Sequence, residues 1–196
     1  MLIIGLGHRA RQGKSTAALA FVEACPIATD VRLVAFGDAL RREVDKMARQ
    51  TGGFHNLLEL LREVYAAPSW VRAEFEGKQR TILQWWGTDY RRKQDPDYWV
   101  KRLVESLAGL NPDVAIVQDM RFPNEADAIK GMGGVVIKVT RLGAPDVSVH
   151  EHASEAALDN YRGWDYHLQA RTVLELKEQV RKVYAEIVRT RCPSTT

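Results

Sequence analysis

Near its amino terminus the chain reads Gly7-His8-Arg9-Ala10-Arg11-Gln12-Gly13-Lys14-Ser15-Thr16, between an apolar run at residues 2–6 and an amphipathic stretch at 15–24. The end of this stretch matches the Walker A pattern G-x-x-x-x-G-K-[ST], which cradles phosphates where a strand passes into a helix. Gly13 lets the backbone approach an anion without a Cβ, and the helix amino terminus offers unpaired N–H groups. The pattern therefore predicts a phosphate-binding turn in a βαβ unit.

Each residue at the end of this turn has an expected contact with a bound ATP. We expect Lys14 to reach the β- and γ-phosphates, Ser15 to ligate Mg²⁺ and Thr16 to bond the α-phosphate. Arg11 and Gly13 complete the predicted ATP contacts. The first glycine of the pattern should stand at position 8, where the chain has His8, and Gly7 comes one residue early. Either His8 adopts the turn geometry with the help of Gly7, or the loop is one residue longer.

Along the rest of the chain, short apolar runs alternate with amphipathic stretches, which is typical of a parallel sheet covered by helices on both faces. Thr172 and Glu175 form a capping box at the start of the last helix. Residues 55–109 show helical patterns and no clear strand. The predicted strands are 2–6, 31–36, 114–118, 135–140 and 166–169, and the predicted helices outside the middle of the chain are 15–24, 38–50, 123–130 and 172–189.

Ligands of such sheets bind beyond the carboxyl ends of the strands, so polar residues there are candidates for the site. Asp119 stands where a carboxylate would hold Mg²⁺, although a turn or cap aspartate would look the same. Arg121 and Arg141 follow two strands and are predicted to act in catalysis by neutralising phosphate charge. The predicted substrate contacts are Asp38, Arg41, Gln84, Asp89, Arg92 and Trp99.

Some of these residues have equally good structural explanations. Arg92 and Lys93 equally fit a solvated helix face. An aromatic stripe such as Ile82, Trp86 and Tyr90 is more often part of a core than a surface for a ligand. The Gln84 amide is suited to reading a base edge. We do not choose between Trp85 and Trp99 as a stacking surface for a base.

Composition excludes several classes of protein. The 196 residues carry a net charge of +3, too mild to indicate nucleic-acid binding, and no stretch is apolar enough to span a membrane. The amino terminus has no basic leader region, so we expect a cytoplasmic protein. Neither Cys25 and Cys192 nor His150 and His152 have zinc-site spacing, and we expect the loop around the two histidines to close over phosphates instead.

Together these motifs resemble the bacteriophage-type deoxynucleoside monophosphate kinases, a branch of the P-loop nucleoside monophosphate kinases. The resemblance covers nearly the whole chain. It is carried by the segments 13–16 (GKST), 36–41 (FGDALR), 84–89 (QWWGTD), 95–100 (DPDYWV), 119–125 (DMRFPNE) and 152–155 (HASE), with Arg141.

The resemblance implies a single P-loop NTPase domain, a three-layer α/β/α fold with a mostly parallel sheet. Its core would be residues 1–50 and 111–196, with a helical substrate-binding insert at about 51–110 and a lid at about 142–157. It implies ATP- and Mg²⁺-dependent conversion of a deoxynucleoside monophosphate (dNMP) to the diphosphate in a host cytoplasm, for viral DNA synthesis. The implied partners are ATP and a dNMP, without nucleic acid or membrane, and the family also favours a homodimer.

Other functions remain open on the sequence alone. A kinase resembling dephospho-coenzyme A kinase or phosphomevalonate kinase also needs arginines for an anionic acceptor. A P-loop protein can also act as a nucleotide-binding switch without transferring phosphate. The arginines at the strand ends argue against the switch, because a switch needs no acceptor clamp.

Overall fold

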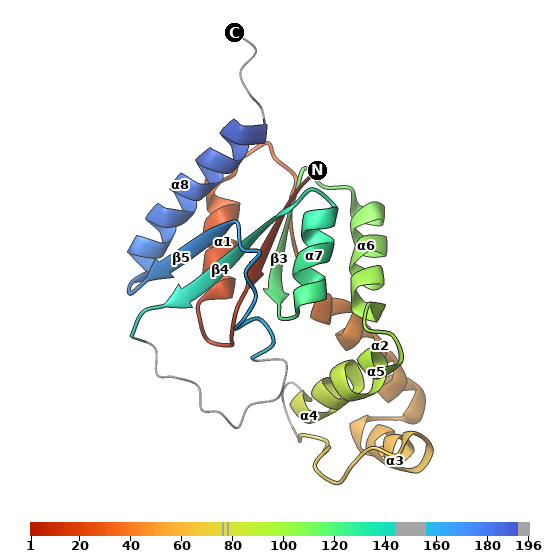
Figure 1. Cartoon of the computed structure of the whole chain (residues 1–196). Helices are drawn as coiled ribbons and strands as arrows, with labels where there is room; N and C mark the ends of the chain where they lie inside the picture. Colours follow the sequence, from red (N-terminus) through yellow and green to blue (C-terminus); the bar gives the residue numbers. More distant parts are fainter. Residues whose placement is uncertain (76, 78, 144–155, 192–196) are drawn as a thin grey trace. The chain divides into compact units, whose positions relative to one another are not determined.

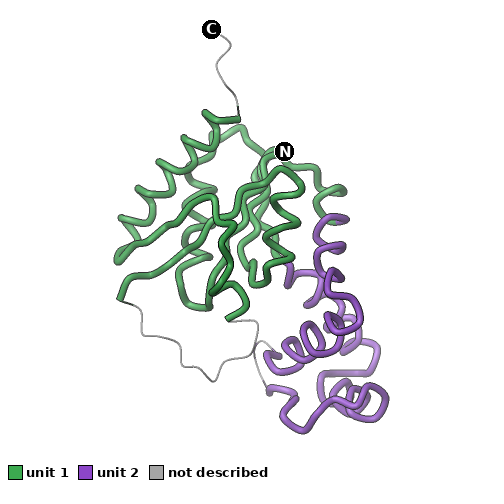
Figure 2. Tube along the Cα trace, viewed as in Figure 1, with its two compact units in different colours: residues 1–35, 106–196 green, residues 36–105 purple. Residues whose placement is uncertain are grey.

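The computed structural model describes residues 1–75, 77, 79–143 and 156–191. The chain forms two compact units, shown in different colours in Figure 2. The sheet unit comprises Met1–Ala35 and Ser106–Thr196, and the helical unit comprises Phe36–Glu105. No helix in the described ranges combines the length and the apolar character needed to cross a membrane.

The sheet unit is built on five strands in the order β2-β3-β1-β4-β5, and every neighbouring pair is parallel. Helices α1 and α8 cover one face and α7 covers the other (Figure 1). This confirms the predicted three-layer α/β/α fold. The elements are β1 (Leu2–Gly7), α1 (Lys14–Ala24), β2 (Val31–Val34), β3 (Val114–Met120), α7 (Pro123–Gly131), β4 (Val135–Arg141), β5 (Tyr166–Ala170) and α8 (Val173–Arg191).

Apolar side chains from the strands and from α1 and α8 form the main core of this unit. Ile4, Leu6 and Phe21 are fully buried, and Val180 of α8 packs into the same cluster. Each such side chain contributes about 1.5–3 kcal/mol through its removal from water. The core thereby fixes the strand ends at which ligands of this fold bind.

The predicted capping box at the start of α8 is present. The backbone N–H of Glu175 donates to Thr172 Oγ1 at 3.2 Å, and the Glu175 carboxylate accepts from the N–H of Arg171 at 2.8 Å. Because these bonds satisfy donors that the first turn of a helix leaves unpaired, they fix where α8 begins.

The predicted strand at 31–36 is wrong at its end. β2 stops at Val34, and Phe36 already begins α2 (Phe36–Thr51). Phe36 is buried at the start of this helix. Asp38 lies in the first turn, where a carboxylate stabilises the positive end of the helix dipole.

The helical unit contains α2, α3 (Phe54–Tyr65), α4 (Arg80–Gln84), the π-helical segment η1 (Trp85–Arg91), α5 (Arg92–Gln94) and most of α6 (Tyr98–Leu110). Its own core joins Val44 and Ala48 of α2 to Leu57 and Leu61 of α3 and to Trp86 of η1. The predicted insert was about 51–110, with residues 1–50 in the core. The compact helical unit defined by contacts runs from Phe36 to Glu105 and so includes α2.

Candidate active site

Parallel register brings the predicted site residues of the sheet unit to one edge. Gly7, the last residue of β1, pairs with Met120 at the end of β3 and with Lys138 near the end of β4. Asp119 and Arg121 flank Met120, and Arg141 ends β4. The loop 8–13, which leaves β1 at this edge, is therefore flanked by the carboxyl ends of both neighbouring strands.

The loop 8–13 has the tight backbone that a phosphate cradle requires. Gly13, the residue before α1, has φ 89°, a left-handed conformation that glycine adopts without steric cost. His8 has φ 117°, so it takes the conformation that the motif normally gives to glycine. The structure therefore agrees with the first explanation for the departure from the pattern, in which His8 itself adopts the turn geometry.

The His8 ring is anchored at this strained position. Its Nδ1 lies 3.2 Å from the carbonyl oxygen of Val139 in β4. Burial, assisted by the positive charge of Lys138, lowers the pKa of the imidazole. A neutral ring that donates to Val139 holds the start of the loop against β4.

Lys14 lies folded across the loop. Its Nζ donates to the carbonyl oxygens of His8 at 2.8 Å and Arg9 at 2.6 Å, and the residue is only 8% exposed. The ammonium group is thus held inside the turn that α1 closes, where an anion at the helix amino terminus would meet it.

Arg9 makes a contact that sequence reasoning did not find. Its guanidinium binds the Asp159 carboxylate through two bonds, Nε at 3.0 Å and Nη2 at 2.6 Å. The bond from Arg9 lowers the pKa of Asp159. Since the partners are 150 residues apart, only the fold reveals that the segment after residue 155 is fastened to the loop.

The segment 119–125 has a clear local cause for its shape. The Glu125 carboxylate is buried and accepts from the backbone N–H groups of Arg121 at 2.7 Å and Phe122 at 3.1 Å. Pro123 is the first residue of α7, a position that needs no N–H donor. These bonds hold the turn after β3 through the backbone of Arg121, so they do not depend on its side chain.

Trp164 is a second residue that the sequence gave no reason to single out. A Cβ on Gly7 would lie 2.7 Å from the Trp164 ring and 2.6 Å from Met120 Cε. The absence of a side chain at position 7 thus lets the indole pack directly beneath the start of the loop.

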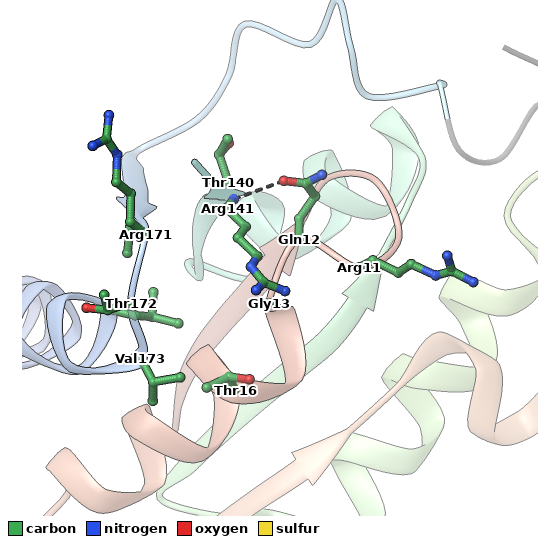
Figure 3. Close-up of a pocket in the computed structure, with 11 residues that line it drawn as sticks. Arg11, Gln12, Gly13, Thr16, Thr140, Arg141, Arg171, Thr172 and Val173 are labelled. Atoms are coloured by element: carbon green, nitrogen blue, oxygen red, sulfur yellow. Dashed lines mark hydrogen bonds between the residues drawn. The ribbon is translucent and has the colours of Figure 1, made fainter. Parts of the chain in front are cut away.

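A pocket of about 170 Å³, partly open to solvent, lies between the loop, β4 and the start of α8. Figure 3 shows Gln12 turned towards the end of β4, where its Oε1 accepts from the N–H of Arg141 at 2.9 Å. Four residues predicted from the sequence line this pocket: Arg11, Gly13, Thr16 and Arg141. Three further lining residues were not predicted as site residues: Gln12 of the loop, and Arg171 and Thr172 of the β5–α8 turn. The sequence pattern at Thr172 indicated only a helix cap.

Mg²⁺ fits the donors at this edge. Ser15 is exposed in the first turn of α1, and Asp119 is half-buried at the end of β3. Within the described ranges no three acidic, histidine or cysteine side chains cluster as a metal site. A P-loop magnesium ion takes few protein ligands and completes its shell with phosphate oxygens and water.

The predicted acceptor residues all belong to the helical unit. Asp38 and Arg41 pair at 2.9 Å on the first turns of α2. Gln84, Asp89 and Arg92 are half-buried along the continuous run α4–η1–α5, and Arg92 Nη1 donates to the Pro96 carbonyl at 3.2 Å.

Trp99 is only 4% exposed, and its Nε1 donates to the Gly87 carbonyl at 2.9 Å. Its contact with substrate stays a prediction, but burial favours a role in holding η1. The predicted lid at 142–157, with His150 and His152, falls almost entirely on residues 144–155, which lie outside the described residues.

Comparison with known proteins gives a consistent assignment. The family model for deoxynucleotide monophosphate kinase matches residues 72–180, more than half of the chain. An uncharacterized protein, ORF77 of Ictalurid herpesvirus 1 (strain Auburn), is 31% identical over 113 residues, 53% of this chain and 46% of that protein. A protein of Acanthamoeba polyphaga mimivirus, provisionally named a deoxynucleotide monophosphate kinase, is 31% identical over 121 residues, 56% of this chain and 58% of that protein.

The chain spans about half the length of these two viral relatives. The family match begins in the helical unit and continues into α8, so it includes η1, the turn after β3 and the β5–α8 turn. On this match, the chain belongs to the deoxynucleotide monophosphate kinase family.

Proposed function

We propose that the protein transfers the γ-phosphate of ATP to a deoxynucleoside monophosphate, giving the diphosphate and ADP. The observation that carries this proposal is the loop 8–13, in which Gly13 has φ 89° and the Lys14 ammonium is held against the His8 and Arg9 carbonyls. A left-handed glycine before a long helix, with a lysine inside the turn, is suited to a triphosphate. The family match supplies the class of acceptor.

Phosphate transfer requires the protein to position two anionic substrates and to neutralise the negative charge of their phosphates. A phosphate oxygen of the acceptor attacks the γ-phosphorus, and the bond from that phosphorus to the β–γ bridging oxygen breaks, so ADP leaves. In this proposal Lys14 moves from the loop carbonyls to the β- and γ-phosphates. Arg121 and Arg141, at the ends of β3 and β4, stabilise the phosphate in transfer.

The remaining predicted roles follow from where the residues lie. Arg11, Gly13, Ser15 and Thr16 contact the triphosphate. Ser15 and Asp119 hold Mg²⁺, which when bound neutralises charge on the β- and γ-phosphates. The donor base enters the pocket between the loop and the start of α8, where hydroxyl and aliphatic side chains of Thr16, Thr172 and Val173 form part of the wall.

The acceptor is assigned to the helical unit. Asp38, Arg41, Gln84, Asp89 and Arg92 are its proposed contacts, with the arginines taking the phosphate and Gln84 the base. Both relatives are viral proteins, which supports a role in precursor supply for viral DNA in the host cytoplasm. A homodimer stays a prediction, which analytical ultracentrifugation would check.

A coupled assay for ADP release tests the proposal. Purified protein receives ATP and Mg²⁺ with each dNMP, each NMP, dephospho-coenzyme A or phosphomevalonate. We expect turnover with at least one dNMP, at a kcat/KM at least tenfold above that for dephospho-coenzyme A or phosphomevalonate. Preferred turnover of dephospho-coenzyme A or phosphomevalonate would assign the protein to another small-molecule kinase activity, and ATP binding without any transfer would favour a nucleotide switch.

A further inference from the structure

The segment η1 (Trp85–Arg91) is wound as a π-helix inside the longer run α4–η1–α5. A π-helical turn is rare and is frequently found at functional sites. Two of the proposed acceptor contacts, Gln84 and Arg92, flank this segment, and Asp89 lies within it.

Gly87 is the first point at which neighbours hold η1. Its carbonyl oxygen accepts the indole N–H of buried Trp99 at 2.9 Å. A Cβ at position 87 would lie 2.7 Å from Leu40 Cδ2, so the missing side chain lets α2 pack against the π-helical turn. These contacts fix the middle of η1 from α6 and from α2.

The Glu43 carboxylate is the second point. Its Oε1 accepts from Trp86 Nε1 at 3.0 Å and from Arg91 Nε at 2.8 Å, and Arg91 Nη2 also binds it. Its Oε2 accepts the Tyr98 hydroxyl at 3.0 Å. One side chain of α2 thus joins η1 to the start of α6.

Aromatic rings surround the guanidinium of this ion pair. Arg91 Cζ lies 4.8 Å from the centre of the Trp86 ring and 4.9 Å from that of Tyr98. Tyr90 stacks on Trp86 at 4.6 Å, with 16° between the ring planes. A phosphate approaching Arg91 would have to displace a carboxylate that binds it through two nitrogens, so Arg91 is poorly suited to clamp the acceptor. Arg92, the next residue in the chain, is better placed to bind the acceptor phosphate in this proposal.

We propose that Glu43 is a positioning residue for acceptor binding, because its carboxylate fixes the π-helical segment that carries Asp89 and adjoins Gln84 and Arg92. This inference rests on the proposed function for the identity of the acceptor. Glu43 touches no reacting atom in this account. Its effect on affinity comes through Arg91, Trp86 and Tyr98.

The test compares Glu43→Gln with the control Glu59→Gln, which changes an exposed glutamate of α3 whose carboxylate lies 3.5 Å from His55 Nε2. Initial rates are measured with ATP and with the dNMP varied in turn. For Glu43→Gln we expect the KM for the dNMP to rise at least tenfold, with the KM for ATP within twofold and kcat within about threefold of wild type. An unchanged dNMP KM, or equal increases in both KM values, would overturn the proposal.

Two further measurements keep the inference separate from the proposed function. Hydrogen exchange should show the amides of 85–91 exchanging at least tenfold faster in Glu43→Gln than in Glu59→Gln, and unchanged exchange would overturn the proposal whatever the activity. Calorimetry with dAMP, dCMP, dGMP and dTMP measures acceptor affinity without any transfer. A wild-type protein that binds a dNMP but transfers nothing would refute only the proposed function.

Tyr98→Phe serves if Glu43→Gln does not fold. It removes the hydroxyl bond to Glu43 and keeps the ring beside Arg91. We expect a smaller rise in dNMP KM or Kd, about threefold, with faster exchange at 85–91. Wild-type values for both would overturn the proposal.

Discussion

Replacing Gly13 by alanine tests the backbone of the phosphate loop at its most demanding position. Gly13 has φ 89° and ψ 14°, where a residue with a Cβ loses about 1–2 kcal/mol. The new methyl group would meet only Leu176 Cδ2, at 3.9 Å, which is ordinary contact. The free energy of unfolding should therefore fall by about 1–2 kcal/mol from backbone strain alone. In a protein of this size that corresponds to a Tm lower by roughly 2–8 °C.

Differential scanning calorimetry without nucleotide measures this change, and titration with ATP and Mg²⁺ measures its effect on the loop. We expect Gly13→Ala to weaken ATP binding at least tenfold, since the methyl group lies where the backbone approaches phosphate. Gly109→Ala is the matched control, because Gly109 lies in α6 with a negative φ and no atom within 4 Å of its new Cβ. It should leave stability unchanged or raise it by up to about 1 kcal/mol. Equal stability of Gly13→Ala and wild type would refute the left-handed turn.

Three other changes probe separate parts of the structure. Gly134→Ala should lower the free energy of unfolding in urea by about 3 kcal/mol, because the Cβ of the alanine would lie 2.8 Å and 2.9 Å from the backbone oxygens of Ile129 and Ile3. A decrease of less than about 1 kcal/mol would contradict that packing. Arg121→Ala should lower kcat about 10³-fold or more while Tm stays within about 2 °C, because the backbone N–H of Arg121 keeps its bond to Glu125; a variant that mainly melts would refute its catalytic role. Asp159→Asn should be less stable than wild type at neutral pH, because the lowered pKa of the Asp159 carboxyl stabilises the fold while that group is ionised. The difference in stability should vanish as pH falls below the folded-state pKa of Asp159. A difference that does not change with pH would argue against the ion pair with Arg9.

The sheet unit could be predicted well because its signals are local. Buried parallel strands read as continuous apolar runs, and the glycine, lysine and serine of the loop must follow one another directly. The strand prediction failed at Phe36: this apolar residue was taken as the end of the strand, although it is the first residue of α2.

The parts that could not be predicted depend on contacts between distant residues. Asp159 reaches Arg9 across 150 positions, and Glu43 reaches Arg91 across 48. Nothing in the spacing of 84–92 distinguishes a π-helical turn from an α-helix, because a single widened turn shifts the pattern by only one residue. The pocket at the start of α8 was not predicted either, because the sequence pattern at Thr172 indicated only a helix cap.

The most direct test of the account follows the γ-phosphate itself. ATP labelled at that position is incubated with Mg²⁺ and each dNMP, and the nucleotides are separated by chromatography. We predict label in the deoxynucleoside diphosphate with wild-type protein, and at least 10³-fold slower labelling with a Lys14→Ala variant whose circular dichroism is unchanged. Label released only as inorganic phosphate, or transfer that persists undiminished without Lys14, would contradict the assignment of the loop 8–13 as the site of phosphate transfer.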